Sequence, residues 1–175
     1  MRLEPVRRRR AETVRVNARS YHWRAGLAVA GGIVVLDQWS KHAVTAAFRY
    51  GEALAITPFF NLVLVYNKGA AFSFLSGASG WQREFFIAIT AAALAVIVAL
   101  VRKHRDEPLF CWGLTMVAGG ALGNLADRVI HGHVIDFLDF HAAGWHFWAF
   151  NVADSAITAG AALLILDSLR PRQAT

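Results

Sequence analysis

The stretch from Phe85 to Val101, FFIAITAAALAVIVALV, decides the fold of this chain. It contains no charged side chain, and Thr90 is its single polar residue. A hydrocarbon core about 30 Å thick is crossed by roughly 20 helical residues, so the stretch is nearly long enough to span a bilayer. The sequence therefore predicts a transmembrane helix here, with lipid as the surrounding solvent.

Three further stretches are apolar over a similar length, and each carries polar residues near one end: 25–47, 109–126 and 147–166. Hydrophobic residues make up 56% of the 175 residues, more than in an ordinary soluble domain. We therefore predict an all-α membrane protein with four transmembrane helices. Between the first two spans, the β-branched and aromatic run 59–66 predicts a small β-rich region outside the membrane.

The basic residues are concentrated on one predicted side of the membrane. Eight of the eighteen lie between Arg2 and Arg24. We therefore interpret the net charge of +6 as a signal for orientation in the membrane and not as a nucleic-acid-binding surface. The connection at 102–105 and the last residues add more basic side chains on that side. Both termini are therefore expected in the cytoplasm, and the connections 48–84 and 128–146 in the periplasm. The expected organisation is a basic arm at 1–24, a membrane domain at 25–169 and a tail at 170–175.

Ionisable and amide side chains collect where the predicted spans meet the periplasm. An ionisable side chain in hydrocarbon costs about 2.5 to 3.5 kcal/mol, so each needs a partner or a function. Asp37 and Lys41 have the i,i+4 spacing of a helical ion pair, for which a structural role is a sufficient explanation. The other members of the group lie at the third span, the following connection and the fourth span: Asn124, Asp127, Arg128, Asp136, Asp139, Asn151 and Asp154.

Asp154 is the hardest of these to explain by structure alone. It lies inside an apolar span, and no basic residue follows it before Arg170. A second carboxylate nearby could share a proton with it, leaving one acid to activate water and the other to protonate an amide leaving group. From spacing, Asp127, Asp136 and Asp139 are all candidates for this partner. A proton relay in a small proton-coupled transporter would use such a pair equally well.

Two other chemistries fit these residues less well. Ser40 and Lys41 are the residue types of a serine–lysine nucleophile, but adjacent helical side chains diverge. The single cysteine, Cys111, excludes an intramolecular disulfide and a cysteine-rich metal site. Four histidines without an HExxH pattern indicate interfacial side chains more than a metal site: His131, His133, His141 and His146.

Five sequence blocks occur in order along the four predicted spans: Asp37-Gln38-Trp39-Ser40-Lys41, Asn67-Lys68-Gly69-Ala70-Ala71-Phe72-Ser73, the glycine-rich run 119–128 ending in Asp127-Arg128, Val134-Ile135-Asp136-Phe137, and Phe150-Asn151-Val152-Ala153-Asp154. In this combination the chain resembles the lipoprotein signal peptidases, also called signal peptidase II. The resemblance covers about 26–169 and leaves out the basic arm.

The resemblance implies an intramembrane aspartyl endopeptidase whose catalytic dyad corresponds to Asp136 and Asp154. It also implies a substrate-binding group, Asn67, Asn124, Arg128 and Asn151, and a supporting group, Asp37, Lys41 and Asp127. No metal or organic cofactor is implied, since water is the nucleophile. The implied substrates are prolipoproteins in the bacterial inner membrane, cut N-terminal to a cysteine that carries diacylglycerol. Membrane lipid is the other expected partner, and the chain is expected to act as a monomer.

Overall fold

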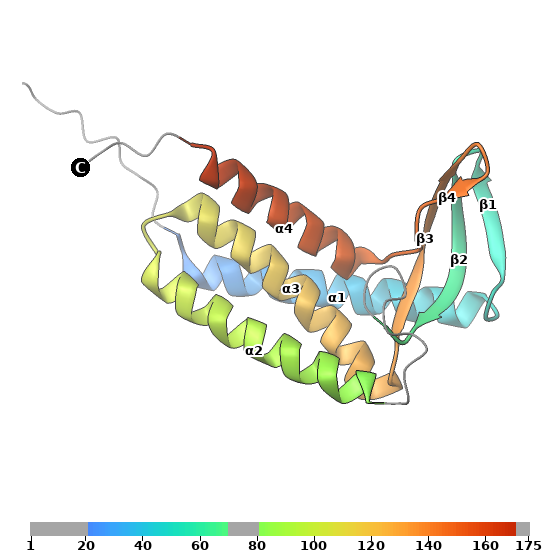
Figure 1. Cartoon of the computed structure of the whole chain (residues 1–175), viewed down its shortest axis with the longest axis horizontal. Helices are drawn as coiled ribbons and strands as arrows, with labels where there is room; N and C mark the ends of the chain where they lie inside the picture. Colours follow the sequence, from blue (N-terminus) through green and yellow to red (C-terminus); the bar gives the residue numbers. More distant parts are fainter. Residues whose placement is uncertain (1–20, 70–80, 171–175) are drawn as a thin grey trace, which may run out of the picture.

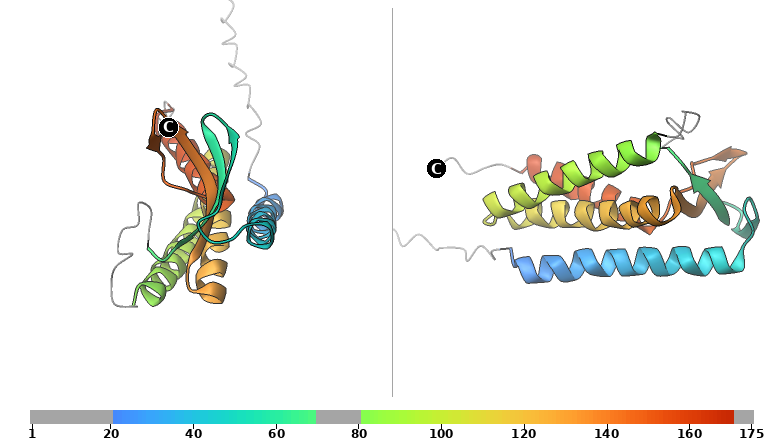
Figure 2. Two further views of the ribbon diagram at one scale, coloured as in Figure 1. Left: turned by 90° about the vertical axis from the view of Figure 1, so that its right-hand side faces the viewer. Right: turned by 90° about the horizontal axis from the view of Figure 1, so that it is seen from below.

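The computed structural model describes residues 21–69 and 81–170. Within these ranges, four helices run side by side and a small sheet lies across one end of the bundle (Figures 1 and 2). Most of the basic arm and the tail, together with residues 70–73 of the second sequence block, lie outside the described residues. The prediction of helices with a small β-rich region is confirmed in this outline.

Three of the four predicted spans coincide with helices, and each of these helices extends beyond the predicted bounds. They are α1 (Trp23–Ala47), α2 (Gln82–Lys103), α3 (Pro108–His131) and α4 (Val152–Ser168). By length and composition, α2 and α3 are apolar enough to cross a membrane. Of the other two, α1 contains the buried charges Asp37 and Lys41, and α4 has 17 residues. Only Gln82 and Ile97 of α2 are buried, as expected for a helix that faces lipid.

The prediction that the fourth span starts near residue 147 was wrong. Residues 147–151 are not helical, and α4 begins only at Val152, with Asn151 as its N-cap. Asparagine is a strong N-cap residue because its side-chain oxygen satisfies an orphan backbone N–H of the first turn. The apolar run continues across this boundary, so hydropathy alone could not find the start of the helix.

The sheet is antiparallel and has four strands in the order β1-β2-β3-β4. These are β1 (Ala53–Thr57), β2 (Phe60–Asn67), β3 (Val134–Ala142) and the two-residue β4 (Trp145–His146). The run 59–66 correctly predicted β2. We did not predict β3, which lies in the second outer connection and pairs with β2, with Asp136 opposite Val65.

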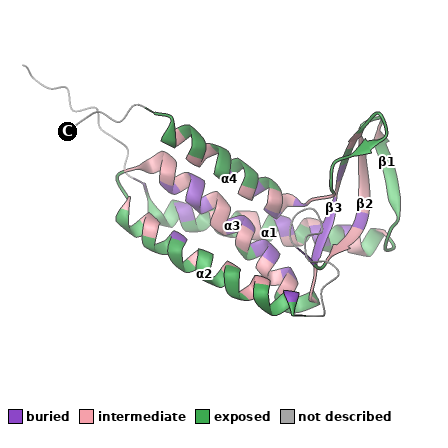
Figure 3. Cartoon of the chain, viewed as in Figure 1, coloured by how far each residue is buried: buried purple, intermediate pink, exposed green. Residues whose placement is uncertain are grey.

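Helix α3 lies at the centre of the bundle and contacts each of the other three helices. Figure 3 shows that buried residues gather along α3 and on β3, whereas α2 is mostly exposed. The GxxxG spacing of Gly119 and Gly123 allows this close approach. A Cβ on Gly119 would lie 3.1 Å from Ala30 of α1, and one on Gly123 would lie 2.6 Å from an oxygen of Asp37.

Candidate active site

The first turn of α4 fixes the position of Asp154. The Asn151 side-chain oxygen accepts a hydrogen bond from the Asp154 backbone N–H at 2.9 Å, and Asp154 Oδ2 accepts one from the Asn151 backbone N–H at 3.3 Å. This reciprocal capping box holds the carboxylate at the sheet end of α4. Its other oxygen, Oδ1, accepts a hydrogen bond from Asn124 Nδ2 at 2.8 Å.

Strand β3 brings Asp136 to the same place. Its Oδ1 accepts a hydrogen bond from Asn151 Nδ2 at 2.7 Å, and its Oδ2 accepts one from Asn67 Nδ2 at 3.1 Å. The side chain is buried, with 3% of the residue exposed. Burial raises the pKa of Asp136 to about 7, and the nearby charge of Asp154 adds to the rise, while the hydrogen bonds from Asn67 and Asn151 oppose it.

The two carboxylates face one cavity of about 740 Å³. Asn67 and Arg128 also line it, and its far side runs along α4 from Ser155 to Ala162. The cavity therefore joins a polar end at the sheet to an apolar wall at the depth of the helices. A cavity with converging polar groups and a carboxyl of perturbed pKa is the usual form of an active site.

Behind this cavity, Lys41 lies in a buried cluster of charges. Its ammonium group is 2.7 Å from Asp37 Oδ2 and 2.8 Å from Asp127 Oδ2, and it donates a third hydrogen bond to Asn124 Oδ1 at 3.1 Å. Lys41 is 1% exposed, Asp127 is 1% exposed and Asp37 is fully buried. Gln38 completes the cluster by donating to Asp127 Oδ1 at 2.8 Å. These contacts connect α1 to α3 with every ammonium proton bonded.

The cluster also determines which way the Asn124 amide points. Asn124 Oδ1 accepts hydrogen bonds from Lys41 and, at 3.2 Å, from Asn151 Nδ2. Because both neighbours can only donate at these atoms, the amide oxygen must face them and the Asn124 NH₂ group must face Asp154. Lys41 thus acts on the carboxylate of Asp154 through one intervening side chain.

Arg128 extends from the end of α3 across the front of the cavity. Its guanidinium donates to the backbone oxygen of Gly69 at 3.2 Å and lies 5.0 Å from the centre of the Phe86 ring. Asn67 Oδ1 accepts a hydrogen bond from the Gly69 N–H at 2.9 Å. Arg128 and Asn67 are therefore joined through one residue at the end of β2. Of the second block, only 67–69 falls within the described residues.

The structure separates the three candidate partners of Asp154. Asp127 points away from the cavity and binds Lys41 and the Ile135 backbone N–H, the latter at 3.0 Å. Asp139 accepts hydrogen bonds from Asn61 at 2.9 Å and from His146 at 3.0 Å, on a different part of the sheet. Asp136 is the one of the three that lines the cavity with Asp154.

The alternative chemistries lack the contacts that they need. Ser40 donates to the backbone oxygen of Asp37 at 2.8 Å, while Lys41 is bonded to carboxylates, so no serine–lysine pair forms. The histidines form two separate ring pairs, His131–His133 at 6.0 Å and His141–His146 at 5.0 Å. Across residues 21–69 and 81–170, no three potential metal ligands come together.

Sequence reasoning missed Gln38 as a member of the buried cluster. It donates to Asp127, to Asp37 Oδ2 at 3.2 Å and to the Gly123 backbone oxygen at 3.2 Å. It follows Asp37 directly within the first block, but helical geometry places neighbouring side chains on different faces. Its acceptors at Asp127 and Gly123 are both on α3, so only the approach of that helix reveals the role of Gln38.

Comparison with known proteins gives a consistent result along the chain. The family model described as "Signal peptidase (SPase) II" matches residues 29–170. A lipoprotein signal peptidase of Janthinobacterium sp. (strain Marseille) is 57% identical over 144 residues, covering 82% of this chain and 87% of the relative. One from Burkholderia vietnamiensis (strain G4 / LMG 22486) is 59% identical over 138 residues, covering 79% and 83%.

The fold also has a solved counterpart. A structure described as a bacterial membrane enzyme, determined by the in meso method at 1.9 Å resolution, superposes with a TM-score of 0.78 at 31% identity. The superposition covers 89% of this chain and 99% of the other. None of these similarities supports the transporter alternative, whereas they confirm the resemblance noted from the five sequence blocks.

Proposed function

Because the chain belongs to the signal peptidase II family, we propose that it removes signal peptides from diacylglyceryl-modified prolipoproteins, with Asp136 and Asp154 as its catalytic dyad. It is an aspartic endopeptidase of the membrane. One observation carries the assignment of the dyad: strand β3 and helix α4 place these two carboxylates at one cavity. The bond cleaved is the one N-terminal to the lipidated cysteine.

The surroundings of the two acids suggest different roles for them. The pKa of Asp136, raised by burial to about 7, keeps this group largely protonated below neutral pH. Asp154 is held by hydrogen bonds from Asn124 and the Asn151 backbone, and as the partner of a protonated Asp136 it is the carboxylate left to accept a proton. In this proposal Asp154 is the general base and Asp136 is the general acid.

Peptide hydrolysis then proceeds in two proton transfers. Asp154 takes a proton from water as the water oxygen attacks the carbonyl carbon of the scissile amide. Asp136 gives its proton to the amide nitrogen as the carbon–nitrogen bond breaks, releasing the amine of the lipidated cysteine and the carboxyl terminus of the signal peptide. One proton returns from Asp154 to Asp136 through solvent before the next turnover.

The remaining residues of the cavity bind and orient the substrate. Asn67 and Arg128 stand at its mouth, where their donors can bind backbone carbonyls of an extended peptide. Asn124 and Asn151 hold the dyad. The small and apolar side chains of α4 farther along the cavity, including Ile157 and Ala162, suit a signal peptide that enters laterally from lipid.

Asp37, Lys41 and Asp127 support the site from behind. Their hydrogen bonds join α1 to α3 and fix the Asn124 amide in the orientation that donates to Asp154. They do not line the dyad cavity. We therefore assign them to positioning the catalytic groups and not to contact with substrate.

Four membrane-spanning helices and a periplasmic site complete the proposal. The start of α1, the end of α4 and the α2–α3 connection all lie at the end of the bundle opposite the sheet (Figure 1). At that end, the backbone N–H of Tyr21 donates a hydrogen bond to the backbone oxygen of Arg105 at 3.2 Å. Since basic segments stay in the cytoplasm, this arrangement supports a periplasmic position for the sheet and the proposed dyad. All proposed site residues come from one chain, so a monomer suffices.

The test is cleavage of a purified diacylglyceryl prolipoprotein by the enzyme in lipid nanodiscs. Loss of general acid or base catalysis costs about 10²- to 10⁴-fold, so Asp136→Asn and Asp154→Asn should each reduce kcat by at least that range. Asp167→Asn is the matched control, because it changes a carboxylate at the opposite end of α4. Cleavage that survived both dyad substitutions would refute the assignment.

A further inference from the structure

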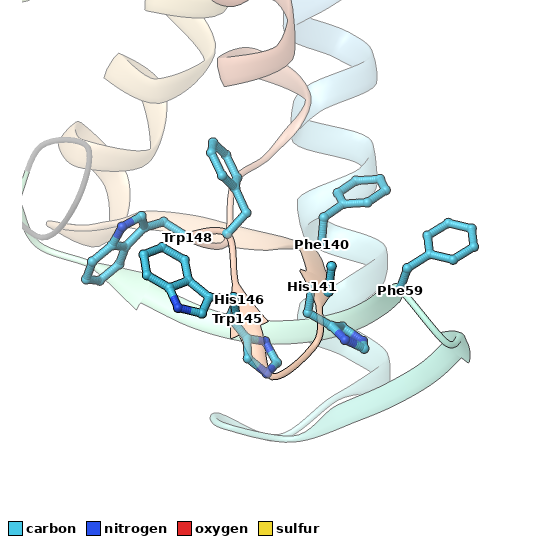
Figure 4. Close-up of a pocket in the computed structure, with 8 residues that line it drawn as sticks. Phe59, Phe140, His141, Trp145, His146 and Trp148 are labelled. Carbon is cyan, nitrogen blue, oxygen red and sulfur yellow. The ribbon is translucent and has the colours of Figure 1, made fainter.

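A second cavity lies beside the dyad cavity, at the edge of the sheet formed by the β3–β4 hairpin. It has a volume of about 450 Å³ (Figure 4). Five aromatic rings supply most of its lining: Phe59, Phe140, Trp145, Phe147 and Trp148. None of the functions assigned above uses this cavity.

These rings are unusually exposed. Trp145 is 84% exposed and Phe59 is 57% exposed, and the other three are exposed to between 42% and 59%. Apolar patches of this kind on a folded chain mark places where another apolar group binds. Together with the cavity, they indicate a binding site whose ligand is hydrocarbon.

The aromatic cavity adjoins the dyad cavity. Phe147 and Trp148 line both cavities and form a shared wall between them. These residues directly precede the segment that leads into Asn151 and Asp154. A ligand in the aromatic cavity therefore lies next to a substrate held at the dyad.

The hairpin has an apolar side and a polar side. In Figure 4 the rings of Phe59 and Phe140 lie toward the helices, and the imidazoles of His141 and His146 point away from them. The imidazoles are held on their side by hydrogen bonds, His146 Nδ1 to Asp139 at 3.0 Å and His141 Nε2 to the oxygen of Asn61 at 3.3 Å. The rings of Phe59 and Phe140 thus form an apolar side toward the helices, and the imidazoles of His141 and His146 form the polar edge of the same cavity.

We propose that the aromatic cavity at the β3–β4 hairpin binds an acyl chain of the diacylglyceryl group on the substrate cysteine. The inference rests on the proposed function, because that function puts two acyl chains on the residue at the scissile bond. One chain would pass the wall of Phe147 and Trp148 and cover the exposed rings. The cavity would then select substrates that already carry lipid, since an unmodified cysteine leaves it empty.

The bilayer itself is the competing occupant, and it predicts a different result. If the rings only anchored the sheet to the outer leaflet, their removal would affect every substrate alike. An acyl-chain site instead discriminates between chain lengths, because a long chain makes more contacts with the rings than a short one. The dependence of KM on acyl chain length is therefore the informative measurement.

The experiment compares Phe59→Ala and Trp145→Ala with wild type in phosphatidylglycerol nanodiscs. Both rings line the aromatic cavity and neither lines the dyad cavity. The substrates are one prolipoprotein peptide carrying either two palmitoyl or two hexanoyl chains. For the palmitoyl substrate we expect KM to rise about tenfold in each variant, and for the hexanoyl substrate we expect a change of less than about twofold.

Trp39→Ala is the control, because Trp39 is 67% exposed on α1 and lies outside both cavities. Equal effects on the two substrates, or no effect on either, would overturn the acyl-chain site while leaving cleavage itself intact. Failure of the wild type to cleave either substrate would instead refute the proposed function.

A labelling experiment tests the same site without relying on turnover. A diazirine placed in the palmitoyl chain of the substrate, bound to the inactive Asp154→Asn enzyme, should crosslink to the hairpin segment 140–148. Labelling confined to the helices would contradict the proposal.

Discussion

Replacing Lys41 with methionine tests the buried cluster behind the dyad. Methionine keeps most of the side-chain length and removes the ammonium group that lies 2.7 Å from Asp37 and 2.8 Å from Asp127. Both carboxylates are almost fully buried, so neither can turn to water for a replacement partner. The substitution therefore leaves uncompensated negative charge between α1 and α3.

The expected cost follows from the burial of all three groups. Removing one partner of a buried ion pair costs about 3 to 5 kcal/mol, mostly as desolvation of the charge left behind. For a chain of this size, each kcal/mol lowers Tm by about 2 to 4 °C, so Lys41→Met should melt roughly 6 to 20 °C below wild type. Turnover should fall as well, because Asn124 loses the donor from Lys41 and keeps only Asn151.

The chain provides its own reporter for this measurement. Cys111 is the single cysteine and is fully buried in α3, so a thiol-reactive dye reports unfolding as fluorescence. Lys103→Met removes an exposed lysine at the end of α2 and should melt with wild type. Adding Asp127→Asn to Lys41→Met removes one orphaned charge and should recover part of the loss. A Lys41→Met protein that melted with wild type would refute the reasoning.

Further outcomes follow from the site. The pKa of Asp136 is raised from 3.8 to about 7, so between these pH values the native state holds a proton that the unfolded chain has lost. The free energy of unfolding should therefore fall by up to about 4 kcal/mol as pH rises from 3.8 to about 7, and it should fall less in Asp136→Asn, as measured by dye-monitored melting. Cleavage should decline as pH rises through and above about 7, where the general acid loses its proton, and a pH–rate profile flat through pH 7 would contradict this. Gly123→Ala places a Cβ 2.6 Å from an Asp37 oxygen and should cost about 1 to 3 kcal/mol, whereas Gly31→Ala, with open space around it, should be neutral in the same melting assay. Asn151→Ala removes the N-cap of α4, which costs about 1 kcal/mol of stability, and it also removes a hydrogen-bond donor to Asp136. Expressed as free energies, the loss in kcat should therefore be far larger than the loss in stability. Equal losses would count against a catalytic position.

The helices were largely predictable because the bilayer imposes one strong rule on sequence. An uninterrupted apolar run such as 85–101 can adopt few structures in a bilayer other than a helix, and the structure has α2 at this position. The start of α4 was not predictable in the same way, since the apolar residues before Asn151 are extended and not helical. Hydropathy measures burial in lipid or protein, and it does not distinguish these two backbones.

The choice of Asp136 shows the corresponding limit for the site. Asp127, Asp136 and Asp139 lie within thirteen residues of one another, and all follow the third span. What separates them is the register of β3 on β2, which sets Asp136 opposite Val65 and Asp139 opposite Asn61. A strand that pairs with a segment about seventy residues earlier leaves no signal in local spacing. Only the family resemblance singled out Asp136 from sequence.

The use of asparagine around the dyad has a physical reason. Asn67, Asn124 and Asn151 give hydrogen bonds to the two carboxylates without adding a charge. A lysine in their place would hold both acids ionised and prevent one from keeping the proton that the leaving group needs. The one buried lysine is instead placed behind Asn124, where its charge is balanced by Asp37 and Asp127. Lys41 can then fix the geometry of the site while leaving the proposed dyad free to share a proton.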